Sequence, residues 1–210
     1  MSSNIKVIVF IVLFIAGAIG GFIYKVSNHN AEPELSALVY PNPKPLPDFQ
    51  LETHKGESFD NDQLLGTWSV IFFGFTFCPD VCPTTMAALG QVAGNLDAKT
   101  ANKVQFIFVS VDPERDTTEK LAEYVPFFNE SFIGLRTDDA KMLESFSREL
   151  GAVYMKVPFG DSYQMEHSAR IFIVDPHGRR YGIFADHPTS PGTIDVATIS
   201  RDIQTLVKYK

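Results

Sequence analysis

The two cysteines of the chain are the residues whose type and spacing most clearly indicate chemistry. Cys78 and Cys82 lie in the stretch IFFGFTFCPDVCPTTM, where an apolar run gives way to Pro83, a residue suited to the first turn of a helix. If this stretch turns helically, the two side chains share one face, with Cβ atoms roughly 5–6 Å apart. That separation permits either a disulfide or the convergence of both sulfurs on one metal ion.

The start of the following helix adds a reason for reactivity, because its free N–H groups and positive dipole end stabilise thiolates and lower the cysteine pKa. Three residues separate Cys78 from Cys82, whereas thioredoxin-type oxidoreductases have two. Pro79 stands where a peroxiredoxin carries its peroxide-binding threonine, which argues against peroxide chemistry. Three interpretations of the two cysteines remain: a metal site, a redox pair, or a purely structural pair that is either inert or bridged by a disulfide.

A third ligand for a metal has to come from the five histidines. Two thiolates make a soft site suited to Cu(I) or Zn, and an added imidazole would suit copper in either oxidation state. His167 ends the polar run DSYQME and precedes a strand expected near the centre of the sheet, whose leading loop faces the cysteine-bearing helix in thioredoxin-like folds. Sequence logic alone leaves its role as a ligand open. The other four histidines are interpreted as solvated loop residues: His29, His54, His177 and His187.

The elements that would position these residues alternate between strand-like and helix-like runs without an internal repeat. Strand-helix-strand followed by a hairpin and a helix predicts an α/β fold with a mixed central sheet, in the thioredoxin-like arrangement. The expected strands are Ser69–Phe75, Val104–Val111, Phe132–Leu135, Tyr154–Val157, Ala169–Val174 and Arg179–Phe184. The expected helices are Pro83–Asp97, Asp116–Asn129, Asp138–Leu150 and Ile194–Lys208.

Composition limits the classes of partner. The chain has 210 residues with a formal charge of -7, and 45% of its residues are hydrophobic, which is typical of a folded protein. Setting aside Lys6 and Lys25 near the amino terminus leaves 16 basic against 25 acidic residues, or -9. An acidic folded part argues against nucleic acid as a partner.

The amino-terminal segment is expected to anchor the protein in a membrane. Residues 7–24 carry no charge and reach the minimum of roughly 17 residues for a spanning helix. The run is longer than the apolar core of a cleaved signal peptide, which is the alternative. No Arg-rich organelle-targeting peptide is present, so we expect a bacterial inner membrane with the folded part on the periplasmic side. The proline-rich residues 25–47 are interpreted as a semi-rigid spacer and residues 48–210 as the folded domain.

Three motifs in order resemble the Sco (SenC) family of membrane-anchored copper proteins, which are required for the assembly of cytochrome c oxidase. They are FGFTFCPDVCP at residues 73–83, SVDPERDT at residues 110–117 and EHS at residues 166–168. The resemblance covers most of residues 48–210 and implies one copper ion per chain, bound by Cys78, Cys82 and His167. Many relatives have histidine at the position of Phe77 and Val-Asp at residues 165–166, so copper affinity and redox tuning here are expected to differ.

The resemblance implies a copper metallochaperone for the dinuclear copper site of cytochrome c oxidase subunit II. The alternative is a thiol–disulfide reductase that keeps the copper-ligand cysteines of its partner reduced, with Cys78 and Cys82 as the redox pair. Whether the protein is an enzyme therefore stays open, as do further copper-delivery or thiol-reducing partners. A charged loop contains Asp112, Arg115 and Asp116. Asp116 or Thr117 is interpreted as the cap of the following helix, and partner docking by the loop is the alternative.

Overall fold

The computed structural model describes residues 11–21, 35–184 and 194–209. The chain divides into two units, one before Leu35 and one from Leu35 onward. In the first unit residues 11–21 are helical. Among the described residues, no helix has both the length and the apolar character needed to cross a membrane. The expected span at residues 7–24 lies partly outside the described residues.

The centre of the sheet is built from the two most apolar runs of the chain. Strand β4 (Trp68–Gly74) pairs in parallel with β5 (Val104–Ser110). Strand β4 is buried along its whole length, because helices cover both faces of the sheet. The full order is β1-β10-β9-β4-β5-β6-β2-β3. The other strands of this sheet are β1 (Leu38–Pro45), β2 (Gln50–Thr53), β3 (Ser58–Asp60), β6 (Ile133–Arg136), β9 (Ile171–Val174) and β10 (Arg179–Phe184).

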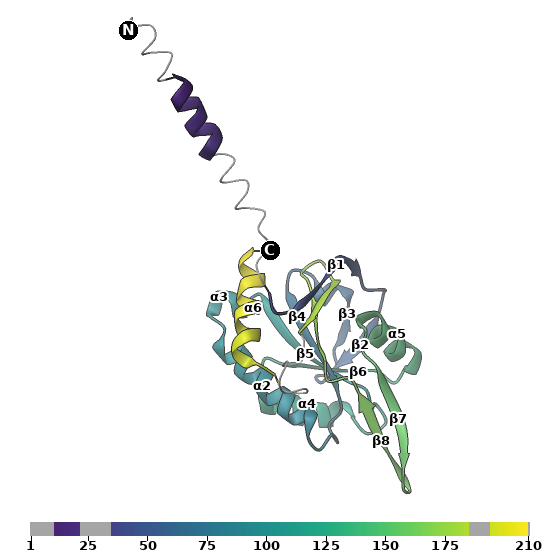
Figure 1. Ribbon diagram of the computed structural model, residues 1–210. Helices are drawn as coiled ribbons and strands as arrows, with labels where there is room; N and C mark the ends of the chain where they lie inside the picture. The colour runs from purple at the N-terminus through teal and green to yellow at the C-terminus, as the bar shows by residue number, and fades with distance from the viewer. Residues whose placement is uncertain (1–10, 22–34, 185–193, 210) are drawn as a thin grey trace, which may run out of the picture. The chain divides into compact units, whose positions relative to one another are not determined.

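Alternate side chains of β4 reach opposite faces of the sheet. Phe72 contacts Phe108 of β5, which in turn contacts Tyr124 of α4. Phe73 points the other way and contacts Phe146 of α5. Figure 1 shows α2, α4 and α6 together on one face of the sheet and α5 on the other. The helices are α2 (Val81–Asn95), α3 (Ala98–Ala101), α4 (Thr118–Phe128), α5 (Ala140–Leu150) and α6 (Val196–Tyr209), with a short 3-10 turn at Asn61–Leu64.

A two-stranded hairpin stands apart from the main sheet. Its strands are β7 (Tyr154–Phe159) and β8 (Ser162–His167), joined by a tight turn in which Gly160 has a positive φ of 58°. Figure 1 shows the hairpin projecting from the body of the domain. From the sequence, only the first strand of the hairpin is expected, and residues 161–166 are interpreted as a polar run. The backbone pairing of β8 with β7 explains the difference, because cross-strand bonds form irrespective of side-chain polarity.

The folded unit begins earlier than the sequence analysis expects. Residues 38–45, interpreted there as part of a spacer, form edge strand β1 against β10. Pro41 and Pro43 fall where the register shifts, and an edge strand tolerates proline because its outer side needs no N–H. The buried carboxylate of Asp202 in α6 accepts the backbone N–H groups of Ser36 and Ala37 at 2.8 and 3.0 Å. The chain leading into β1 is therefore tied to the last helix.

Candidate metal centre

The two cysteines lie where β4 passes into α2. The backbone N–H of Cys78 donates to the carbonyl of Phe75 at 3.2 Å, which tightens the loop before the helix. Cys82 lies in the first turn of α2, and its N–H donates to the Sγ of Cys78 at 3.4 Å. Both thiols are free. The predicted placement of the pair at a strand-to-helix junction agrees with the structure, and the helical N–H groups do reach the first sulfur.

Gly74 allows the second sulfur to lie against the end of β4. A Cβ on this residue would be 3.0 Å from the Sγ of Cys82 and 2.8 Å from a ring carbon of Phe108. Both separations are closer than ordinary carbon contacts, so any side chain would displace the sulfur or the ring. The glycine thus sets the depth of Cys82, whose side chain is fully buried.

A buried carboxylate fixes the loop that carries Cys78. Asp116 accepts hydrogen bonds from the N–H of Thr76 at 3.1 Å, from its hydroxyl at 2.6 Å and from the hydroxyl of Ser110 at 2.6 Å. Burial raises the pKa of Asp116, and these bonds oppose that rise. The interpretation of Asp116 as a helix cap is wrong, since Thr117 is the N-cap and accepts from the N–H of Lys120. Asp116 instead connects β5 to the cysteine loop.

His167 reaches the cysteines from the end of β8. Its Nε2 lies 3.2 Å from the Sγ of Cys82, and its Nδ1 lies 3.2 Å from the carbonyl of Ser168. In the tautomer with a proton on Nδ1, donated to that carbonyl, the lone pair of Nε2 is available to a metal; in the other tautomer Nε2–H can donate to the sulfurs. The rings of Phe72 and Phe75 contact the imidazole edge to face and hold its plane. The structure therefore brings the predicted histidine to the cysteines.

The three side chains form one cluster of metal-ligand type. One donor atom from each of Cys78, Cys82 and His167 lies within 4.8 Å of the others. The hydrogen bond from the Cys82 thiol, with a smaller contribution from His167, lowers the pKa of Cys78 to about 4 despite burial. Donating that bond, together with burial, raises the pKa of Cys82. The metal-free pair therefore consists of one thiolate and one thiol, and a cation near both sulfurs would favour loss of the remaining proton.

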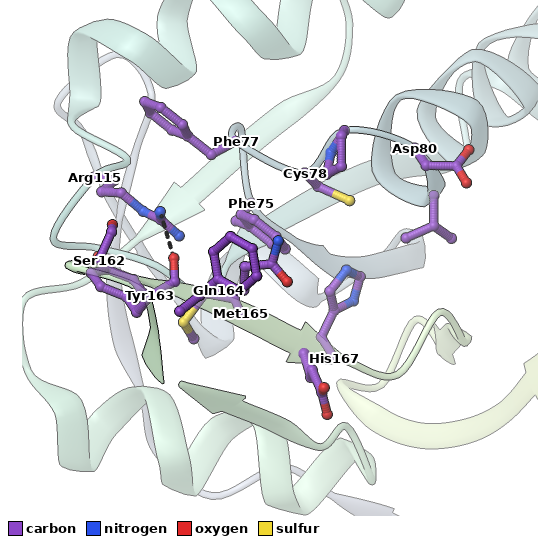
Figure 2. Close-up of a pocket in the computed structure, with 14 residues that line it drawn as sticks. Phe75, Phe77, Cys78, Asp80, Arg115, Ser162, Tyr163, Gln164, Met165 and His167 are labelled. Atoms are coloured by element: carbon purple, nitrogen blue, oxygen red, sulfur yellow. Dashed lines mark hydrogen bonds between the residues drawn. The ribbon is translucent and has the colours of Figure 1, made fainter. Parts of the chain in front are cut away.

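A cavity of about 670 Å³ opens beside the cluster. Figure 2 shows Phe77, Cys78 and Asp80 on one side of it and the β8 residues from Ser162 to His167 on the other. Cys78 lines this cavity, whereas the buried Cys82 does not. A ligand or partner entering from solvent therefore meets Cys78 and His167 first.

The charged loop after β5 joins the hairpin to the domain. Asp112 pairs with Arg115 and accepts the hydroxyl of Tyr163 at 2.8 Å. The guanidinium of Arg115 stacks on the Tyr163 ring at 4.0 Å and lies 5.1 Å from the ring of Phe77. Sequence reasoning overlooked Tyr163, although the alternation of Tyr163, Met165 and His167 with polar residues is a strand signal.

The two other histidines that the structure describes, His54 and His177, take no part in the cluster. The interpretation of His54 as a solvated loop residue is wrong: it is buried, and its Nδ1 accepts the N–H of Gly134 at 2.9 Å. Burial is the main reason why the pKa of His54 is lowered. Its burial follows from the pairing of β2 with β6, which places it beside a glycine. His177 is exposed in its turn, as expected, and His29 and His187 lie outside the described residues.

Comparison with known proteins decides the family. The model of the SCO1/SenC family matches residues 41–205. The chain belongs to this family. Among SCO1/SenC relatives, an SCO2-like protein of Rickettsia conorii is 33% identical over 184 residues, which cover 85% of this chain and 88% of the relative. The predicted family is confirmed.

Solved SCO1/SenC structures confirm the thioredoxin-like α/β fold with a mixed sheet. The solution structure of apo Sco1 from Thermus thermophilus has a TM-score of 0.71 and 34% identity, covering 84% of this chain and 99% of that one. Bradyrhizobium japonicum ScoI, solved with copper bound, has a TM-score of 0.65 and 31% identity, covering 78% and 99%. Both alignments span nearly the whole of the solved domain, so the likeness is not confined to the cysteine motif.

Proposed function

We propose that this protein is a copper metallochaperone that binds one copper ion through Cys78, Cys82 and His167. The observation that carries the proposal is the convergence of two sulfurs and one imidazole nitrogen within 4.8 Å. Thiolate sulfur is a soft ligand that favours Cu(I), imidazole also suits copper, and three such ligands make a low-coordinate site. The copper-bound structure of the related Bradyrhizobium japonicum ScoI supports the assignment.

The geometry suits transfer as well as binding. Cys78 and His167 face the cavity, so a thiolate of a partner can approach copper from that side and replace these ligands one at a time. Cys82 is the deepest ligand and would be the last to release. Each exchange keeps the coordination number nearly constant, which avoids a free ion.

The proposed recipient is the dinuclear copper site of cytochrome c oxidase subunit II, as family membership implies. We propose that residues 7–24 anchor the protein in a bacterial inner membrane and that the domain works on the periplasmic side. The uncharged run of residues 7–24 supports the anchor.

Copper titration of the purified domain in a reduced state tests the binding proposal. Cys78→Ala, Cys82→Ala and His167→Ala should each lower the affinity, and the cysteine variants should lower it most because each removes a thiolate. His177→Ala is the matched control, since this exposed histidine lies away from the cluster. Unchanged stoichiometry and affinity in all three ligand variants would contradict the proposal.

Thiol–disulfide reduction is the second candidate, favoured by the exposure of Cys78 to the cavity above the buried Cys82. The thiolate of Cys78 would attack a disulfide of the partner, forming a mixed disulfide and releasing one partner thiolate. The sulfur of Cys82, after losing its proton to water, would then attack Cys78. This releases the second partner thiolate and leaves a Cys78–Cys82 disulfide, so two electrons pass to the partner.

His167→Ala separates the two candidate functions. Reduction needs only the two sulfurs, whereas copper binding also uses the imidazole. A variant that reduces a disulfide substrate at the wild-type rate but binds copper weakly is the expected result if both activities are present. If His167→Ala loses copper binding and the wild-type protein shows no reductase activity, the second candidate is rejected.

A further inference from the structure

The β7–β8 hairpin has two outer edges, because it forms a sheet of its own. Neighbouring residues of a strand direct their backbone N–H and C=O groups alternately toward the partner strand and away from it. The register pairs Lys156 with Met165 and Pro158 with Tyr163. In a pair that exchanges hydrogen bonds, the backbone groups of both residues point toward the partner strand. In the next pair, which exchanges none, they point to the outer edges of the hairpin.

Three observations settle the alternation. The N–H of Ser168 donates to the carbonyl of Val153 at 2.9 Å, so the pairs two and four residues further along the ladder also exchange bonds. Pro158 has no N–H and so cannot belong to a fully bonded pair. The carbonyl of Tyr163 accepts from Nη1 of Arg115 at 3.2 Å, so it points away from β7. The backbones of Tyr163, Met165 and His167 therefore face the outer edge of β8.

The two outer edges differ in how they are protected. On β7 the outward positions include Lys156 and Pro158, and lysine and proline are the residues that natural proteins use to block an exposed edge. On β8 the outward positions include Met165 and His167. Their backbone groups have no hydrogen bond to another element among the described residues. One edge is thus blocked, while on the other the backbone groups of Met165, a residue only 8% exposed, and of the half-buried His167 lack partners.

The free edge of β8 lies along the cavity beside the cysteines. Figure 2 shows Tyr163, Met165 and His167 across the cavity from Phe77 and Cys78. The side chain of Phe77 is 56% exposed and that of Phe159, at the hairpin tip, is 65% exposed. Unsatisfied backbone groups and exposed aromatic rings together suit an extended peptide segment that carries an apolar side chain.

The charges around the cavity define the segment further. Asp80 and Glu166 flank the metal ligands, and among the described residues neither carboxylate has a hydrogen bond or an ion pair. The nearby basic side chains of Arg115 and Lys156 are already paired with Asp112 and Glu114. Among the charged side chains that line the cavity, the unpaired ones are therefore the acidic Asp80 and Glu166, which a basic segment complements. The ammonium of Lys120 lies outside this lining, 4.6 Å from the Phe77 ring.

We propose that the outer edge of β8 binds an extended segment of a partner protein as an added antiparallel or parallel strand. The segment has a basic residue next to a sulfur ligand and an apolar residue that packs on Phe77. Strand addition would place the sulfur of the partner beside Cys78 and His167. Only the identity of the partner, as the protein that receives the copper, rests on the proposed function.

A short synthetic peptide tests the proposal on the metal-free protein, with binding followed by amide hydrogen exchange. The peptide is acetylated and amidated and contains valines, a phenylalanine and a methionine flanked by lysine; methionine avoids disulfide exchange. We expect the amides of Met165 and His167 to gain protection, because they acquire partners. The amides of Gln164 and Glu166, already bonded to β7, should change little.

Two control peptides make the result specific. N-methylation of alternate amides that face β8 should weaken binding by about tenfold or more, since each buried hydrogen bond contributes roughly 1 kcal/mol. Methylation of the other alternate set should leave the affinity unchanged. Glu166→Gln combined with Asp80→Asn should weaken the lysine peptide and spare a version with norleucine in place of lysine.

Equal binding after either methylation, or protection confined to amides elsewhere, would overturn strand addition. Tighter binding of a glutamate-containing peptide would overturn the basic character of the segment. Neither readout involves copper. Peptide binding without copper affinity would therefore retain the docking edge and reject the metallochaperone, and copper affinity without peptide binding would do the reverse.

Discussion

The cysteine loop and the β7–β8 hairpin bring ligands to the same point but are held very differently. Cys82, in the first turn of α2, packs against Gly74 at the buried end of β4, and the loop carrying Cys78 is tied to β5 by Asp116. The hairpin that carries His167 stands outside the main sheet. It joins the charged loop through the Tyr163 hydroxyl and its carbonyl, and through an exposed ion pair.

The difference assigns separate tasks to the ligands. Two sulfurs in a rigid setting define a permanent half-site, which needs little reorganisation when copper arrives. An imidazole at the base of this hairpin can leave the sulfurs at the cost of its contacts with Phe72 and Phe75, without breaking the hydrogen bonds of the main sheet. Release of copper should therefore begin at His167. Changes in the scaffold should lower the stability of the whole domain as well as copper binding, whereas changes in the arm should loosen the hairpin locally.

Loss of the buried carboxylate should have the largest effect. Asp116→Ala removes the acceptor for Thr76 and Ser110 and should lower the free energy of unfolding by about 3 kcal/mol, since several buried donors lose their partner. Urea denaturation measures this change. Asp161→Asn in the exposed hairpin turn is the control and should be neutral. A stability loss no greater than that of the control would mean that the loop is not held by Asp116.

A side chain at Gly74 tests whether the sulfur depth is fixed. Gly74→Ala should destabilise the fold by about 1–3 kcal/mol through overpacking against Cys82 and Phe108, and should weaken copper binding. Gly94→Ala is a matched control, because nothing lies near its Cβ position in α2 and alanine favours the helix. Thermal unfolding measures stability and copper titration measures affinity. The half-site is rigid if Gly74→Ala lowers both quantities and Gly94→Ala lowers neither.

Alkylation of Cys78 tests the electrostatics of the half-site. The pKa of about 4 predicts a rate with iodoacetamide that stays nearly constant down to roughly pH 5 in metal-free protein. Because the folded pKa lies below the unfolded one of about 8.5, the thiolate stabilises the fold at high pH. That contribution is lost as the pH falls toward 4.

Cys82→Ala is the control for this prediction, since it removes the thiol that donates to Cys78. The midpoint of the alkylation profile should then move to higher pH. A midpoint near about 8.5 in the wild-type protein would show that neither the neighbouring thiol nor the helix start stabilises the thiolate.

The arm should respond with the smallest effect. Tyr163→Phe removes the hydroxyl donated to Asp112 and keeps the ring beneath Arg115, so the cost is about 1 kcal/mol. Amide exchange should quicken in β7 and β8 and stay unchanged in β4. Tyr209→Phe, at an exposed site on α6, is the control. Faster exchange throughout the main sheet would show that the hairpin is coupled to the core after all.

The same comparison explains how far the sequence predicts the molecule. The apolar runs of β4 and β5 and the helix that starts near Pro83 are strong local signals, and the structure agrees with them within a few residues. The hairpin was only half predicted, because β8 is stabilised by pairing with β7 rather than by an apolar face. Strand β1 was missed because prolines are signals against strands, although they are tolerated at an edge.

The site divides along similar lines. Cys78 and Cys82 are only four positions apart in the sequence, so their spacing alone predicts a shared site. His167 is far from them in sequence. Its place before a central strand made it the leading candidate among the histidines, but its role as a ligand stayed open until the family resemblance, since its position depends on the hairpin. Asp116 and His54 were misinterpreted because burial by distant strands decides their roles. Local patterns do not report such long-range packing.

The bond between Asp202 and the chain entering β1 bears on how the domain can be shortened. A fragment starting at Asp48 would lack β1, expose the outer side of β10 to pairing with other molecules, and leave a buried carboxylate with neither of its two amide donors. A fragment starting at or before Leu35 keeps both features. A recombinant fragment of the folded unit should therefore begin at or before Leu35, ahead of the prolines of β1, and not after them.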